Sequence, residues 1–170
     1  LPEKITAIED CAFSEGSSLT GVVLPDNITT IGASAFNGCS SIDKIVLPEG
    51  VTSIGRNAFA GTKITEITIP STVTQMHGDT YSEYDRYSAL AGATELKLVI
   101  FEERTDIPSY ALQGCNQITE VVIPDEVTVI GRYAFRGCSS IEKLDLPEKI
   151  TAIEDCAFSE CSSLTGVFLP

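Results

Sequence analysis

The sequence predicts an α/β repeat solenoid, a coil with one parallel β-sheet face and short helical or 3₁₀ turns. One observation is that residues 1–25 and 146–170 are identical at 23 of 25 positions. The other is an apolar residue followed by proline, which recurs about every 22–23 residues. The prolines of this pattern are Pro2, Pro25, Pro48, Pro70, Pro124, Pro147 and Pro170. With Phe101 in the proline place of the fifth unit, about seven units tile residues 1–170 as a single array, which we interpret as a fragment of a longer one.

Each unit contains a short alternating segment, such as Leu19-x-x-Val22-x-Leu24, which predicts a β-strand. Proline lacks a backbone N–H and ends the strand. An Ala-Phe pair follows in most units, as at Ala12-Phe13, and we expect it to lie in a helical or 3₁₀ turn. Stacked coils place equivalent strands about 4.8 Å apart. The phenylalanines should therefore stack inside the coil.

The recurring pattern L-x-x-[IV]-x-[LI]-P-x-x-[IV]-x-x-I-x-x-x-A-F-x-x-C resembles the leucine-rich repeats of the BspA-like (bacterial surface protein A-like) class. The asparagine ladder of the commoner leucine-rich repeat is missing, because its place holds Lys4, Asn27 and Gly50 in the first three units. The resemblance implies a leucine-rich repeat coil. It also implies an adhesion and binding array, secreted or on the surface of a microbe that lives in an animal host.

The composition is strongly acidic, with 24 Asp and Glu against 11 Lys and Arg and a net charge of −13. Nucleic acids and anionic membranes attract basic proteins, so this balance argues against both as partners. The sequence also lacks an apolar run near the roughly 20 residues that cross a bilayer. We therefore predict neither nucleic-acid binding nor membrane insertion.

The sequence offers no catalytic motif. Its one histidine, His77, lies in an insertion without a recognisable catalytic neighbour, and no phosphate loop, nucleophile elbow or metal-binding helix is present. We therefore predict a protein that is not an enzyme and has no cofactor and no metal site.

Four cysteines share one position, fourteen residues after the proline place. They are Cys39, Cys115, Cys138 and Cys161. Other units carry Gly16, Thr62 and Ala93 there, which indicates a small internal site. We expect buried free thiols at this position rather than disulfides, because the side chains should all point the same way into the coil. Zinc ligands are not expected either, because no Cys-x-x-Cys spacing occurs.

An acidic line follows the proline place. Its residues are Glu3, Asp26, Glu49, Ser71, Glu102, Asp125 and Glu148. Two interpretations remain open: a solvated row of turns, or a strip that attracts calcium or a basic partner.

The clearest break in the pattern is an insertion at about 77–88, HGDTYSEYDRYS. Tyr81, Tyr84 and Tyr87 are spaced by three and lie beside Arg86. Tyrosine and arginine are favoured at binding hot spots, and insertions on solenoids are often binding elements. The alternative is that these tyrosines pack on neighbouring coils and close the bulge.

The sheet face is the other candidate surface. The alternation predicts an outward apolar row along it, and the predicted partner-binding residues there are Val46, Thr68, Val99 and Val122. Either a partner covers this row, or β-propensity alone selects valine there. If the predicted register of a strand is wrong by one residue, a side chain assigned to the outer face of the sheet points into the core instead. We expect the insertion to project beside this face.

The leading prediction is a non-enzymatic protein-binding and adhesion module of a microbial cell-surface or secreted protein, with a host extracellular or cell-surface protein as its partner. One alternative is a structural spacer stalk. Another is an intracellular protein-interaction scaffold, since unpaired cysteines suit a reducing compartment. Because both ends stop in repeat register, we also expect end-to-end self-association.

Overall fold

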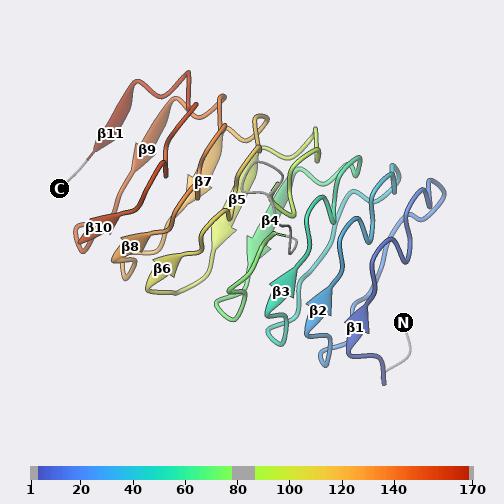
Figure 1. Cartoon of the computed structure of the whole chain (residues 1–170). Coiled ribbons are helices and arrows are strands. Elements are labelled where there is room, and N and C mark those ends of the chain that lie inside the picture. The colour runs from blue at the N-terminus through green and yellow to red at the C-terminus, as the bar shows by residue number, and fades with distance from the viewer. Residues whose placement is uncertain (1–3, 78–86, 169–170) are drawn as a thin grey trace.

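A computed structural model describes residues 4–77 and 87–168 of the chain. These residues form a parallel β-solenoid of about seven turns, with the N- and C-terminal turns at opposite ends of the stack (Figure 1). Every regular element in the described part of the chain is a short strand. The predicted repeat solenoid is confirmed, whereas the predicted helical or 3₁₀ turns are wrong.

The strands form two parallel rows, where the sequence predicted one sheet face. The long-strand row consists of β4 (Glu66–Ile69), β5 (Leu98–Phe101), β7 (Glu120–Val122), β9 (Lys143–Asp145) and β11 (Gly166–Phe168). The short-strand row consists of β1 (Ala7–Ile8), β2 (Thr30–Ile31), β3 (Ser53–Ile54), β6 (Asp106–Ile107), β8 (Val129–Ile130) and β10 (Ala152–Ile153). Strands pair only with their own row, in the orders β4-β5-β7, β11-β9, β1-β2-β3 and β10-β8-β6.

A threonine ladder runs beside the short-strand row. Its members occupy one position in every unit: Thr6, Thr29, Thr52, Thr74, Thr105, Thr128 and Thr151. The Thr29 hydroxyl donates to the Thr6 carbonyl at 3.1 Å, and the Thr29 amide donates to the same oxygen at 2.8 Å. The same two bonds join Thr52 to Thr29, Thr74 to Thr52, Thr128 to Thr105 and Thr151 to Thr128, which fixes the register of the short strands.

The turns after the short strands are not helical, because every described turn except the fourth has two residues with a left-handed backbone, and the fourth has one, Gly92. In the first turn these are Cys11 and Glu15, with φ of 56° and 63°. Hydrogen bonding there alternates: the Ala12 amide donates to Glu9 within the turn, while the Cys11 amide donates to Ala33 of the next turn at 2.9 Å. A helix would direct all these donors along its own axis. We call this stacked segment the turn side.

The core is one continuous cluster of isoleucine, leucine, valine and phenylalanine side chains. Phe36 stacks between Phe13 and Phe59, with ring centroids 5.4 and 5.9 Å away and ring planes within 5° of parallel. Phe135 and Phe158 form a second stack at 5.2 Å. The predicted internal stacking is therefore confirmed, and each turn buries its apolar face against its neighbours rather than within itself.

The fifth unit corrects one prediction. Val99 is fully buried, because it pairs with Ile67 and Val121 on the inward side of the long-strand row. Phe101 lies opposite Ile69 rather than opposite a proline, so the strand is shifted by one residue relative to the predicted alignment. The outward residues of this strand are instead Leu98 and Ile100, both half-buried.

Three of the four predicted internal thiols are confirmed. Cys39, Cys115 and Cys138 are fully buried and unpaired. The Cys39 thiol donates to the carbonyl of Phe13 in the preceding turn at 3.0 Å. Burial raises the pKa of the Cys115 thiol to about 12. Cys161, in the last turn, is only half-buried because no described turn covers it.

Candidate binding surfaces

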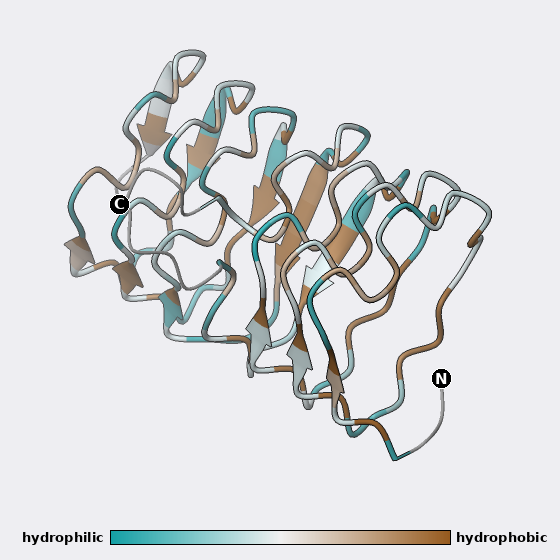
Figure 2. Cartoon of the chain, turned by 45° about the vertical axis from the view of Figure 1, so that its right-hand side comes forward, coloured by the Kyte–Doolittle hydropathy of each residue, from teal (hydrophilic) through white to brown (hydrophobic). Residues whose placement is uncertain are grey.

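A line of exposed apolar residues runs along the outward side of the long-strand row and continues over residues 19–24 and 42–48, which hold the equivalent position in earlier turns without forming a regular strand. Val23 is 83% exposed, Val46 66% and Val122 44%. Thr68 is also exposed and interrupts the line, and Ile100 continues it in the fifth turn in place of Val99. Hydrophobic and hydrophilic segments alternate along this row, as expected for strands that pack one face on the core and expose the other to solvent (Figure 2).

Two hollows on this row join into a groove across the first three turns. One has a volume of about 420 Å³ beside Val23, and the other about 770 Å³ beside Thr68. Both are lined by Asp43, Lys44 and Val46, so they are continuous. A groove with valine at its centre and charged side chains around it has the composition of a protein-docking surface.

The acidic line reaches one edge of this groove. The carboxylate of Glu102 raises the pKa of Glu49, and both residues line the larger hollow. Glu102 also accepts a hydrogen bond from the Ser71 amide at 3.3 Å, so these three members of the predicted line lie on adjacent turns. In residues 4–77 and 87–168, no three acidic, histidine or cysteine side chains are grouped as a metal site requires.

The base of the insertion lies on the turn side. His77 and Ser88 form an antiparallel bridge that closes it, and the His77 ring packs edge-on against Tyr110 at 5.0 Å. The Ser88 hydroxyl donates to the carbonyl of Ala111 at 2.5 Å. Tyr87 is 46% exposed. The remaining predicted binding residues of the insertion, Tyr81, Tyr84 and Arg86, lie outside the described residues.

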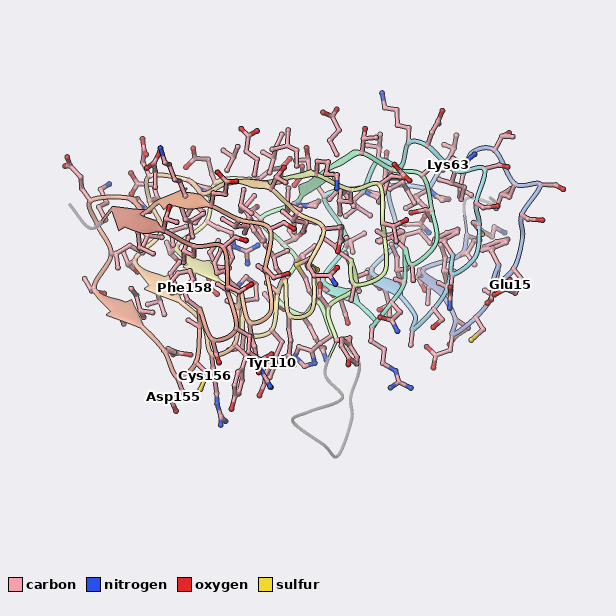
Figure 3. All side chains as sticks on the ribbon, turned by 90° about the horizontal axis from the view of Figure 1, so that it is seen from above. Glu15, Lys63, Tyr110, Asp155, Cys156 and Phe158 are labelled. Atoms are coloured by element: carbon pink, nitrogen blue, oxygen red, sulfur yellow. The ribbon has the colours of Figure 1, made fainter. Side chains whose placement is uncertain are left out.

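The described base of the insertion is therefore separate from the groove. Figure 3 shows Tyr110 on the opposite side of the molecule from Lys63, which lines the larger hollow. The structure brings Val46 and Thr68 together in the groove and places Val122 further along the same row. It does not bring Tyr87 to them.

An aromatic and arginine cluster beside the insertion was missed by the sequence analysis. Tyr110 and Tyr133 stack at 5.4 Å, and the guanidinium groups of Arg132 and Arg136 lie 4.9 and 5.5 Å from the Tyr133 ring. Arg136 also pairs with Glu160 at 2.7 Å, which raises the arginine's pKa. The signal was available, because the two tyrosines occupy the same position in consecutive units.

The short strand, the proline and the stacked turn side define a leucine-rich repeat. The family described as the BspA type leucine-rich repeat region matches residues 1–88 and 86–170 in six copies, and the chain belongs to this family. Leucine-rich repeat families are generally non-enzymatic protein-interaction modules, and no enzymatic family is indicated for this chain.

Solved structures with the same fold come from bacteria. A leucine-rich cell surface protein from Faecalibacterium prausnitzii is 27% identical, with a TM-score of 0.58, over 96% of this chain and 42% of that one. A T. pallidum leucine-rich repeat protein is 25% identical, with a TM-score of 0.59, over 98% of this chain and 66% of that one. A pneumococcal vaccine antigen, 19% identical with a TM-score of 0.57 over 99% of this chain and 40% of that one, shares the fold. The chain thus spans less than two thirds of each.

No curated protein matches the chain in sequence. Within the described residues, no helix is present that is long and apolar enough to span a bilayer.

Proposed function

We propose that the chain is a non-enzymatic adhesion module of a bacterial cell-surface or secreted protein, and that it binds a host extracellular or cell-surface protein. The observation that supports this is the groove on the long-strand row, with Val23 and Val46 exposed at 83% and 66%. Isolated valines at such exposure are ordinary, but a line of them beside a groove is typical of an interaction surface.

The surface location is supported by the family and by the name of the Faecalibacterium prausnitzii neighbour. The same groove favours a binding module over a spacer stalk, since a stalk has no need of an apolar surface. The buried unpaired cysteines do not favour an intracellular scaffold. Burial raises the pKa of Cys115 and Cys138 and leaves little thiolate to oxidise, so these thiols persist in either compartment.

The partner we expect has an apolar anchor side chain framed by charges of both signs. Val46 offers the apolar floor, Lys44 and Lys63 offer cations, and Glu66 offers an anion, all within the larger hollow. The insertion, with Tyr81, Tyr84, Arg86 and Tyr87, is a separate second contact in this proposal.

The experiment that tests the groove is the double substitution Val23→Ser and Val46→Ser, since both side chains line it. Both side chains point to solvent, so the melting temperature should stay within about 2 °C of the wild type, as expected for exposed positions. Binding to a host extracellular protein captured by the wild-type chain should fall at least about tenfold, measured by biolayer interferometry.

The matched comparison is a Tyr81→Ser, Tyr84→Ser and Tyr87→Ser triple variant in the insertion. Loss of binding in the valine variant alone assigns the partner to the groove, and loss in the tyrosine variant alone assigns it to the insertion. Full binding by both variants, with unchanged melting temperatures, would reject these surfaces as docking sites.

A further inference from the structure

The groove on the long-strand row opens where neighbouring segments are not joined by hydrogen bonds. Its larger hollow is lined by residues 43–47 and strand β4, and its smaller one by residues 20–24 and the same 43–47 segment. No backbone N–H or C=O of residues 20–24 and 43–47 is hydrogen-bonded to another described residue, whereas β4, β5 and β7 form a continuous ladder. Ile45 and Leu47 are each only 7% exposed, so part of this unbonded backbone is buried. Buried backbone groups are almost always paired, so a ligand in the groove meets donors and acceptors that the fold leaves open.

Acidic side chains outnumber basic ones around the groove. Its carboxylates are those of Asp26, Asp43, Glu49, Glu66 and Glu102, against the ammonium groups of Lys44 and Lys63. No ion pair joins any of these five carboxylates to a described residue. The negative charge of Glu102 raises the pKa of the Glu49 carboxyl, so these two groups repel each other. The groove therefore has an excess of negative charge that its own lysines do not neutralise.

The apolar end of the groove lies a short way from this acidic pair. Val23 and Val46 line the smaller hollow, and Glu49 lines the larger one. Glu49 follows Val46 by three residues, which is about 10 Å in an extended chain. An extended peptide lying across the groove covers the same distance in about three of its own residues. A single short segment of a partner therefore reaches both ends.

We propose that the groove binds an extended segment of a basic protein, whose apolar side chain packs against Val23 and Val46. An arginine about three residues further along this segment bridges the carboxylates of Glu49 and Glu102. This inference rests on the proposed docking function of the groove and names the chemistry of its partner. The net charge of −13 also attracts a basic partner from a distance.

Arginine matches the groove better than lysine or a metal ion does. Its planar guanidinium carries five N–H donors, so it bonds two carboxylates and has donors left for an open backbone carbonyl. Lysine offers a compact point charge with three donors. Calcium would leave the apolar half of the groove empty, and the described residues do not gather the three acidic groups that a metal site requires.

The test is selection of a phage-displayed library of random peptides on the full chain, followed by calorimetry with the synthesised winners. The selected sequences should contain an arginine about three residues from an apolar residue. A glutamine variant, Glu49→Gln with Glu102→Gln, should bind them about tenfold or more weakly, because hydrogen bonds to charged groups are lost. Its fold should be unchanged, since glutamine at position 102 still offers an acceptor to the Ser71 amide. Replacing the peptide's arginine by lysine should weaken binding less than replacing it by glutamine.

The matched control is Asp125→Asn with Glu148→Gln, which removes two charges from the same acidic line at residues that line neither hollow. It should bind the peptides as the wild type does. Selected peptides without a basic residue, full affinity in the glutamine variant, or an equal loss in the control would each overturn the proposal. So would a selection that enriches no sequence. Calcium binding that the glutamine variant loses, with no peptide bound, would make the acidic pair a cation site and the peptide assignment wrong.

This inference and the docking function fail separately. A host protein that is lost from the Val23→Ser and Val46→Ser variant but binds the glutamine variant at full affinity would keep the groove as a docking site and reject the basic segment. Full binding of that protein by the valine variant would reject the groove as its docking site, whatever the glutamine variant does.

Discussion

The thiol position shows how tightly a single side chain is specified in this solenoid. Cys138 is fully buried, and its thiol donates to the carbonyl of Leu112 in the preceding turn at 3.3 Å. In the third turn Thr62 holds the same place, where its hydroxyl donates to Phe59 at 2.7 Å. The position therefore accepts a small side chain, with or without a hydrogen-bond donor. Its repeated use of Cys, Thr, Ala and Gly allowed the sequence to predict a small buried site.

Replacing Cys138 by leucine should overpack this site. We expect Cys138→Leu to lower the free energy of unfolding by about 1–3 kcal/mol, because the added carbons meet closely packed neighbours. Cys138→Thr, which introduces the side chain of the third turn, should cost less. Urea unfolding followed by circular dichroism measures both. Equal losses in the two variants would show that size is not what selects residues here.

Val99 shows where residue-level prediction failed. Its unit has no proline, and Phe101 was placed where proline stands elsewhere. In the structure Phe101 is the last strand residue, paired with Ile69, and Val99 points inward. Residues after the turn keep the predicted register, since Thr128 still bonds to Thr105. The turn between strand and threonine is therefore one residue shorter in this unit, and a side chain changes face when a strand shifts by one.

At the scale of the element, the turns differ most from expectation. The Ala-Phe pair suggested a helical segment, but left-handed residues such as Ser34 and Asn57 prevent one. Glycine at the second left-handed position of most turns, as at Gly38 and Gly61, was the available signal. The first position was harder to predict, because cysteine, serine, asparagine and tyrosine all adopt it and only stacking holds them there. The strands were predictable because alternation depends on burial alone.

Close stacking of the turns also explains a glycine that is not left-handed. A Cβ on Gly55 would lie 2.4 Å from the backbone nitrogen of Ala33 in the preceding turn. Gly55→Ala should therefore separate the two turns and lower the melting temperature by several degrees, at about 2–4 °C per kcal/mol for a chain of 170 residues. The control is Gly21→Ala, where nothing lies within 4 Å of the added carbon and stability should not fall. A fall of the same size in both variants would exclude the close approach as the cause.

At the scale of the whole molecule, the stack has a direction. On the turn side each turn donates to the next, as from Phe13 to Ala35, whereas in the short-strand row each turn donates to the one before, as from Gly32 to Ile8. The two ends of the described array are therefore complementary. The sequence already indicated that the two ends are complementary, because units one and seven are nearly identical. It could not place the groove and the base of the insertion on different sides, since that separation depends on how the coil closes.

The same end surfaces carry charges that oppose stacking. Glycine occupies the second left-handed position of the inner turns, as at Gly38 and Gly137, but the first and last turns carry Glu15 and Glu160. In an end-to-end pair these two carboxylates would lie on adjacent turns. Repulsion between exposed charges is screened by salt, with a Debye length near 10 Å at about 0.1 M. Self-association of the 1–170 polypeptide should therefore be weak at low ionic strength and stronger at high ionic strength.

The exposed cysteines make this association measurable. Cys11 and Cys156 occupy the same position of the first and last turns and are both exposed. In an end-to-end pair they would lie about 4.8 Å apart, within reach of a short bis-maleimide. We expect crosslinked dimers whose yield rises with salt, rises further in a Glu15→Gly and Glu160→Gly variant, and vanishes in Cys11→Ser or Cys156→Ser. The glycine substitutions also remove strain at left-handed residues, so they should not impair folding. A monomer by light scattering at every salt concentration, with no Cys11–Cys156 crosslink in the glycine variant, would show that the ends do not pair.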